Sequence, residues 1–279
     1  MIRHTVTGLS FATLFLISFV GSAVAQSGPL KIEGHLIQGG MAWGHVTPGS
    51  KVHFLKRDVR VGEDGLFVIG FGRDFGATAD VVVTAPDGRK KSHVLDIKKR
   101  QYKIQRIDGL PKKMVSPGPK ALKRIRRDNK LIGAARRHDT PEPHFAKGFA
   151  WPVIGPISGV YGSQRVLNGK PRRPHFGVDV ARPTGTPVGA ATSGTVVLAE
   201  KDLYFTGGTV IIDHGHGVTS LYMHMNSVTT RVGATVAQGD LIGTIGKTGR
   251  ATGAHLDWRI NWFNQKIDPQ LLVPPMPKN

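Results

Sequence analysis

The chain contains no cysteine, which excludes a disulfide framework and any metal site built from thiolates. Acidic residues are also scarce, with 19 Asp and Glu against 38 Lys and Arg, and the formal net charge is +19. Such a balance favours adhesion to polyanions. No basic motif interleaved with aromatic residues accompanies it. We therefore expect cell-wall polymers or anionic lipid headgroups as partners, and no nucleic acid.

Long apolar runs are equally rare, and the one that occurs extends from Leu9 to Val20. Arg3 and His4 precede it, and Ala23-Val24-Ala25 follows with the small-x-small pattern of a signal peptidase site. The run is short for a membrane span, which needs about 20 residues. Residues 1–25 are therefore predicted to be a signal peptide, with a retained N-terminal anchor as the alternative. The mature protein is expected in the periplasm or cell envelope, without a transmembrane segment.

Residues 26–106 consist of short β-prone segments separated by turns. Glu63-Asp64-Gly65 and Pro86-Asp87-Gly88 are turn signals. Strands are expected at residues 51–55, 66–71, 81–83 and 94–97. Several strands with frequent turns predict a small β-sandwich. The histidines of this region are scattered and form no catalytic pattern.

Residues 107–148 are predicted to be a basic linker that contains a helix at 120–138. Prolines surround this segment and limit the helix at both ends. Its apolar stripe is thin, and Lys and Arg fill most other positions. The helix is interpreted either as a solvated face packed lightly on a domain or as a contact patch for anionic envelope surfaces.

Residues 149–279 are again rich in β-prone segments and glycine. The clearest strands are expected at residues 195–199, 209–213, 220–224 and 241–245. No long amphipathic helix interrupts them, which indicates an antiparallel all-β domain. Apart from the basic helical linker, the mature chain is therefore predicted to be all-β.

Three segments of this second domain carry side chains that bind metals or move protons. His175 and Asp179 are separated by three residues, with Gly177 allowing a tight bend between them. The alternation of a strand places Tyr222 and His224 on one face, opposite an apolar face. In the third segment, the same alternation puts His255 and Asp257 on one face of their strand.

These segments together supply three imidazoles and two carboxylates from one predicted sheet. A catalytic zinc site needs three protein ligands and an open position for water. Bound zinc activates that water and polarises a scissile carbonyl, and further histidines can move protons or stabilise an oxyanion. The residue types therefore point to metal-assisted hydrolysis.

From residue 151 onward the sequence resembles the lysostaphin/LytM-type zinc endopeptidases of peptidoglycan. The resemblance rests on four segments in family order, which cover nearly the whole second domain. They are residues 155–162 (GPISGVYG), 175–179 (HFGVD), 214–224 (HGHGVTSLYMH) and 239–257, which includes GDLIG and TGRATGAHLD. The resemblance implies a small antiparallel β structure of the duplicated hybrid motif kind, with a substrate groove.

The resemblance also implies a role for each matching residue. His175 and Asp179 correspond to zinc ligands, and His224 and His255 to catalytic histidines. The third ligand of the family is normally the second His of a His-x-His motif, and here Asp257 stands in its place. A carboxylate can bind zinc, but a His-Asp-Asp site is also open to other divalent ions such as Mn²⁺. His214 and His216 fall in a glycine-flanked turn and are expected to have no metal role.

Two functions follow from this pattern. The first is a periplasmic zinc-dependent endopeptidase that cuts the peptide stems or cross-links of peptidoglycan. The second is a weak or inactive relative that binds the cell wall and regulates other hydrolases. One ligand position has changed, and to another residue that can bind metal, which favours the enzyme.

Overall fold

The computed structural model describes residues 30–107, 118–167 and 169–277. The predicted signal peptide lies outside these residues. Within them the chain consists mainly of strands, with one α-helix and the short 3₁₀ helices η2 (His144–Lys147) and η3 (Pro269–Leu271). The prediction of an all-β fold is confirmed. None of the described helices combines the length and the apolar composition needed to cross a bilayer.

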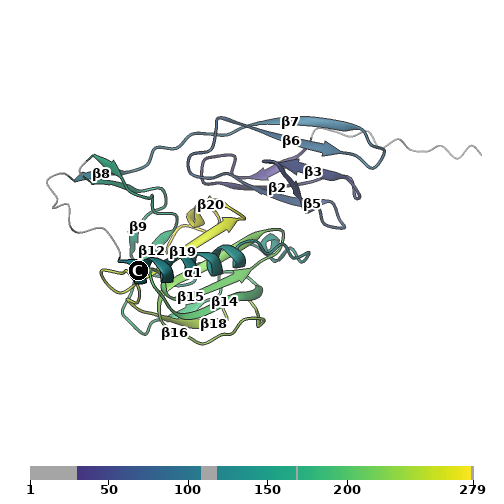
Figure 1. Cartoon of the computed structure of the whole chain (residues 1–279). Coiled ribbons are helices and arrows are strands. Elements are labelled where there is room, and N and C mark those ends of the chain that lie inside the picture. The colour runs from purple at the N-terminus through teal and green to yellow at the C-terminus, as the bar shows by residue number, and fades with distance from the viewer. Residues whose placement is uncertain (1–29, 108–117, 168, 278–279) are drawn as a thin grey trace, which may run out of the picture.

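Two small antiparallel sheets form the N-terminal part of the structure (Figure 1). The first contains β1 (Ile32–Gly34), β2 (Met41–His45) and β5 (Leu66–Gly70), in that order. The second has the order β4-β3-β6-β7, with bounds Arg57–Val59, Lys51–Phe54, Thr78–Thr84 and Lys90–Asp96. Alternation places Val52 and Phe54 inside and Lys51 and His53 outside. Each strand predicted from the sequence of this region is present.

The C-terminal part is one antiparallel sheet of ten strands. Its main path has the order β17-β14-β15-β16-β19-β12-β9, and β13, β18 and β20 pair at its sides. In chain order the bounds are β9 (Ile157–Gly159), β12 (Val178–Ala181), β13 (Pro187–Gly189), β14 (Gly194–Leu203), β15 (Gly207–Asp213), β16 (Val218–Val228), β17 (Thr235–Val236), β18 (Leu241–Ile245), β19 (His255–Trp262) and β20 (Gln265–Ile267). The four strands predicted in this region are confirmed.

The two faces of the central strands have different coverings. On one face Tyr222, Trp258 and Ile260 belong to the main hydrophobic core. On the other face, helix α1 (Pro119–Ala135) packs Ile132 and Ala135 against four apolar residues of the sheet. These four are Leu198, Leu203, Ile211 and Leu221. The predicted basic helix is therefore present, and its thin apolar stripe is what attaches it to the sheet.

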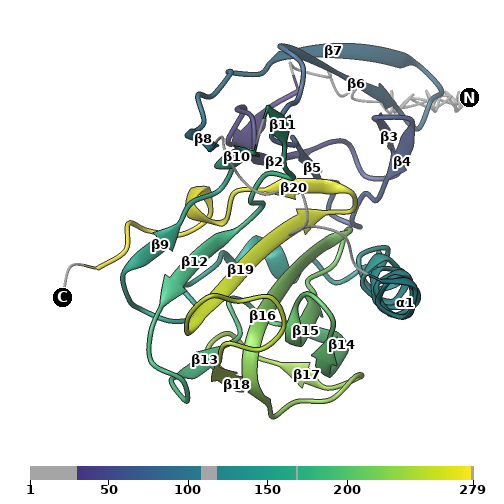
Figure 2. The same cartoon turned by 60° about the vertical axis from the view of Figure 1, so that its left-hand side comes forward.

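The N-terminal and C-terminal parts are joined by a shared core and by polar contacts. The rings of Phe54 and Trp262 lie 5.7 Å apart, and the Arg73 guanidinium donates a 2.8 Å hydrogen bond to the Gly162 carbonyl. Strand β8 (Ile104–Ile107) pairs in parallel with β10 (Gln164–Leu167), which also pairs with β11 (Lys170–Pro171). Figure 2 shows the N-terminal sheets resting above β19 and β20. The domain borders proposed from sequence, at residues 106 and 148, stay a prediction.

The buried His214 gives the fold a pH dependence. Its Nδ1 lies 2.7 Å from the Ser193 carbonyl oxygen, and its Nε2 lies 2.7 Å from Ser220 Oγ. Burial lowers the pKa of His214 to about 4, whereas about 6.5 applies to an unfolded chain. Between these values the unfolded chain binds more protons, so stability falls as the pH falls. The contribution of His214 to this loss between pH 7 and pH 5 is expected to be about 2 kcal/mol.

Urea unfolding at pH 7 and pH 5 measures this loss. His214→Gln should be less stable than the wild type at pH 7 and should lack most of the loss between the two pH values. His138→Gln, at an exposed position, serves as the control and should behave as the wild type. If His214→Gln kept the pH dependence of the wild type, His214 would not be the group that causes it.

Candidate active site

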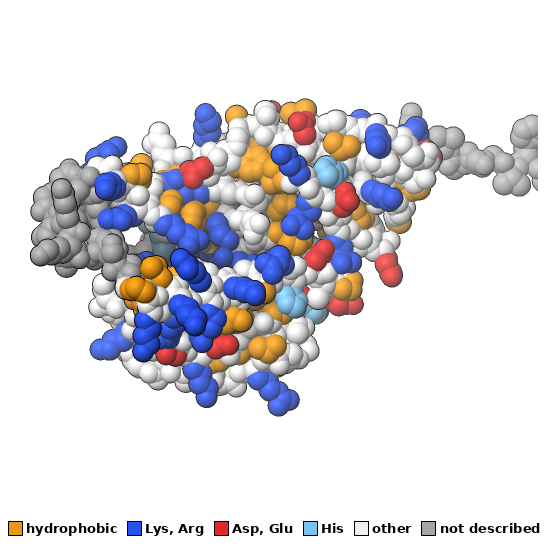
Figure 3. Space-filling model, viewed as in Figure 1, with side chains coloured by type: hydrophobic (Ala, Val, Ile, Leu, Met, Phe, Trp, Pro, Cys, Tyr) orange, Lys and Arg blue, Asp and Glu red, His pale blue; other side chains and the backbone are white. Residues whose placement is uncertain are grey.

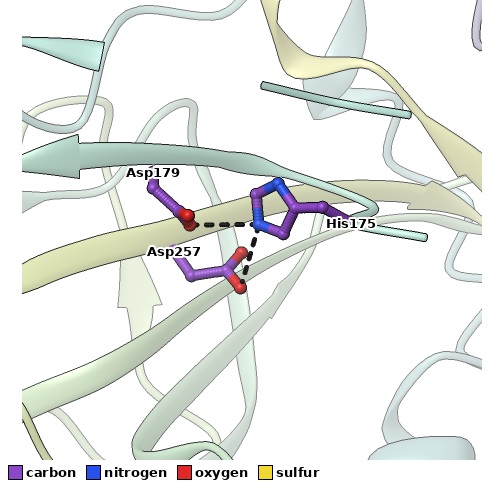
Figure 4. A group of neighbouring side chains, drawn as sticks. All are labelled: His175, Asp179 and Asp257. Carbon is purple, nitrogen blue, oxygen red and sulfur yellow. Dashed lines mark ion pairs between the residues drawn. The ribbon is translucent and has the colours of Figure 1, made fainter. Parts of the chain in front are cut away.

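Two carboxylates face each other across neighbouring strands at the centre of the site. In the antiparallel pair β12–β19, Asp179 lies directly opposite Asp257 (Figure 4). Like charges opposite one another destabilise a sheet pair unless a cation lies between or beside them. Asp257 is buried and Asp179 is partly buried, so water screens their repulsion poorly. The register of these strands therefore requires positive charge at this point.

His175 supplies the first of these cations. It lies just before β12, and its Nε2 is 3.0 Å from Asp179 Oδ1 and 3.4 Å from Asp257 Oδ2. The other ring nitrogen, Nδ1, lies 3.3 Å from the Val160 carbonyl oxygen, which leaves Nε2 directed at the carboxylates. Burial alone would lower the pKa of His175, but the two carboxylates outweigh burial and raise that pKa to about 10.

Glycines allow the strands to approach these side chains closely. A Cβ on Gly159 of β9 would overlap Asp179 Oδ2. A Cβ on Gly177 would lie 2.7 Å from Asp257 Oδ1 and 2.5 Å from Arg259 Cγ. From the sequence, Gly177 is predicted to allow a tight bend. The structure gives a different reason, because Gly177 has no positive φ and is instead confined by β19.

Arg259 provides a second cation, which is not among the site residues predicted from the sequence. Its Nε donates to Asp257 Oδ1 at 2.9 Å, and a terminal nitrogen donates to Asp257 Oδ2 at 2.5 Å. Burial opposes the charge of Asp257, but Arg259 and then His175 keep the pKa of this carboxyl well below its usual range. The sequence could have indicated the contact between Arg259 and Asp257, because residues two apart in a strand share one face.

The two predicted catalytic histidines lie side by side next to the carboxylates. The rings of His224 and His255 are 4.8 Å apart, and His255 Nε2 is 3.8 Å from Asp179 Oδ1. Each Nδ1 is held by a carbonyl oxygen, that of Thr248 for His224 at 2.8 Å and that of Gly253 for His255 at 2.9 Å. Burial lowers the pKa of His224, which favours its neutral form.

The prediction that Tyr222 and His224 share a face was wrong. Tyr222 is fully buried in the core, where its hydroxyl accepts a hydrogen bond from the Ala191 amide at 2.8 Å. His224 has a positive φ of 64°, which interrupts the alternation of β16 and turns its ring toward His255. Sequence periodicity does not foresee such a residue, because left-handed backbone is uncommon outside glycine.

A divalent ion fits the donor set formed by His175, Asp179 and Asp257. One ligand atom from each lies within 4.8 Å of the others. Among the described residues, His175 Nε2 and Asp179 Oδ1 are buried atoms without a hydrogen-bond partner, although they face each other. A cation between them would satisfy both. Asp257 is less available, since Arg259 binds both of its oxygens, but a carboxylate has further lone pairs to offer.

His214 and His216 lie away from this group. The His214 ring is fixed by Ser193 and Ser220, and His216 Nε2 lies 2.9 Å from the Pro141 carbonyl oxygen. Within the described residues, neither His belongs to a cluster that could hold a metal ion. Their expected lack of a metal role stays a prediction.

Comparison with known proteins identifies the domain that carries this site. Residues 173–269 match the profile of peptidase family M23. The C-terminal domain belongs to this family. The matched residues of the M23 domain include His175, Asp179 and Asp257, as well as both predicted catalytic histidines. The resemblance to lysostaphin/LytM-type peptidases that the sequence indicated is thereby confirmed.

Relatives of the M23 domain include two proteins named for cell-wall chemistry. The DD-carboxypeptidase/endopeptidase Mpg of Neisseria meningitidis is 36% identical over 106 residues, which are 38% of this chain and 24% of Mpg. The peptidoglycan DD-endopeptidase ShyA of Vibrio cholerae is 39% identical over 87 residues, or 31% of this chain and 20% of ShyA. The chain thus spans no more than about a quarter of these curated relatives.

A solved structure resembles far more of the chain. A Pseudomonas aeruginosa protein assigned to peptidase M23 matches 84% of this chain and 93% of its own length, with a TM-score of 0.67 and 28% identity. The matched 84% of the chain is longer than the segment 173–269 that the M23 profile covers. The N-terminal sheets and the M23 domain therefore occur together in another protein of similar fold.

Gly159→Ala tests whether the close approach of β9 shapes the site. The added Cβ should displace the Asp179 carboxylate and weaken any binding of Zn²⁺ at least about tenfold, because one candidate ligand moves. Gly253→Ala is the matched control, since a Cβ there meets no atom within 4 Å. Isothermal titration with Zn²⁺ distinguishes the two variants. Equal zinc affinity in both would show that Asp179 is not confined as described.

Proposed function

We propose that the protein is an exported, zinc-dependent endopeptidase that hydrolyses peptide stems or cross-links of peptidoglycan in the periplasm or cell envelope. One observation carries the proposal: His175, Asp179 and Asp257 converge beside the His224–His255 pair in an M23 domain. The names of Mpg and ShyA support peptidoglycan as the substrate. The net charge of +19 suits residence at a polyanionic wall.

Three side chains would hold the ion, and each is already oriented by a neighbour. The Val160 carbonyl turns His175 Nε2 inward, Gly159 leaves room for Asp179, and Arg259 holds Asp257. When bound, a zinc ion supplies Lewis acidity toward the scissile carbonyl and toward a water molecule. Mn²⁺ is the second candidate because two of the three donors are carboxylates.

His224 and His255 would manage protons and developing negative charge. Hydrogen bonds to Thr248 and Gly253 place a proton on each Nδ1 and leave each Nε2 directed elsewhere. A neutral His224 can accept a proton at Nε2, consistent with the lowered pKa that burial gives it. His255 lies beside Asp179, and its imidazolium form, which carries a second proton on Nε2, would donate that proton toward the substrate oxygen.

One observation favours the second function, a cell-wall binding protein that regulates other hydrolases. Arg259 neutralises Asp257 and brings a positive charge next to the place of the ion. Both effects weaken the attraction of the site for a divalent cation. The regulator remains the runner-up because the other metal-binding and catalytic side chains are all in place.

Metal content and digestion of purified sacculi test the proposed function together. The wild type should contain about one zinc ion per chain and release soluble peptides from sacculi. Asp179→Asn should lose both properties, because a neutral amide is a weaker ligand than a carboxylate. A metal-free, inactive wild type in which Asp257→His acquires zinc would instead establish the regulatory alternative.

His224→Ala separates catalysis from metal binding. The variant should retain its zinc but lose about 10²–10⁴-fold in turnover, which is the usual contribution of general acid–base catalysis. His53→Ala, an exposed position of the N-terminal sheets, should retain full activity. The measurement is the rate of peptide release from sacculi at equal metal content. Full activity in His224→Ala would remove His224 from the mechanism.

A further inference from the structure

A group of cationic side chains adjoins the candidate metal ligands on the same face of the sheet. We call Arg136, Arg173, Arg259 and Lys266 the cation cluster. Leu221 lies opposite Arg259 in the β16–β19 pair, and α1 packs Ala135 into the same apolar cluster as Leu221. The end of α1 thus brings Arg136 beside Arg259.

The two remaining members reach the cluster from other elements. Lys266 of β20 lies opposite Asn261 of β19, and its Nζ donates a 2.9 Å hydrogen bond to the Asn261 side chain. Asn261 and Arg259 share one face of β19. Arg173 precedes His175, in the segment whose Gly177 packs against Arg259. Figure 3 shows Lys and Arg side chains gathered over α1 and the adjoining sheet, with few acidic ones among them.

Within the part of the chain that the structure describes, the cluster lacks matching negative charge. Arg259 occupies both oxygens of Asp257, and Asp179 faces His175. Among the described residues, neither Arg136, Arg173 nor Lys266 forms an ion pair, and Arg136 Nε is buried without a hydrogen-bond partner. Burying charge without a partner is costly, and charged groups in proteins are normally paired.

The pKa values of the cluster express the same shortage of anions. Burial, together with Arg259 and Arg173, lowers the pKa of Arg136 to about 9. Burial, together with Arg136, Arg173 and Arg259, lowers the pKa of Lys266 to about 6. An anion bound here would relieve the repulsion within the group.

We infer that the cation cluster binds a carboxylate group of the peptide substrate. This inference rests on the proposed function, because Arg259 of the cluster binds Asp257, one of the candidate metal ligands. Peptides offer carboxylates at their ends and side chains, and the fork of Arg matches a carboxylate in a bidentate manner. The site would thus select peptides with a free carboxylate near the bond that is cut.

Binding of a small probe tests the inference without any turnover. The probes are N-acetyl-alanyl-alanine in its L,L and D,D forms, each with a free carboxylate, and the matching C-terminal amides. The protein is the full chain after treatment with EDTA, titrated by NMR or calorimetry. The better-bound acid should bind roughly ten- to hundredfold more tightly than its amide, as expected for charge-assisted hydrogen bonds. Equal affinities for acid and amide would overturn the inference.

Variants test whether the preference for the acid over the amide arises from the cation cluster. Arg136→Gln and Lys266→Gln should each reduce the preference for the acid, while Arg126→Gln, an exposed Arg of the same helix, should preserve it. Without ligand, Arg136→Gln should melt no lower than the wild type, because it removes a charge whose Nε is buried without a hydrogen-bond partner. A preference that survives in both variants would overturn the inference, as would tighter binding of inorganic phosphate than of either dipeptide. Failure of metal binding or digestion in the wild type would concern the proposed function alone.

Discussion

The opposition of Asp179 and Asp257 across β12 and β19 is the constraint on which the rest of the site depends. Two carboxylates in register repel each other, and burial strengthens the repulsion. His175 and Arg259 offset it from two sides, and the unpartnered atoms of His175 and Asp179 leave a place for a further cation. Binding of a cation and stability of the fold are therefore linked here, because the two carboxylates destabilise the strand pair by repelling each other and also attract a cation.

The surroundings of the site explain why it can be so densely charged. The opposite face of β19 carries Leu256, Trp258 and Ile260, which anchor the strand in the main core. The N-terminal sheets extend that core, with Phe54 against Trp262. A strand fixed this firmly on one face can hold unfavourable charges on the other.

The sequence predicted the fold well because its strands have clear alternation and its turns carry Gly, Pro and Asp. It also predicted the convergence of His175, Asp179 and Asp257, through family order and through alternation in β19. The alternation rule gave a wrong prediction in β16. The positive φ of His224 turns that side chain to the opposite face, and Tyr222 lies in the core. Arg136 and Lys266 escaped notice because they reach the site from elements that only tertiary packing brings together.

The pairing of β12 with β19 also has a consequence for the time at which the site forms. Asp257 lies 78 residues beyond Asp179 along the chain, and β16 stands between β19 and β15 in the sheet. Contacts between such distant residues form slowly during folding. A growing polypeptide must also extend past Arg259 before the full constellation of charges exists. The site therefore cannot assemble until residues 257–259 have been synthesised and β19 has paired with β12.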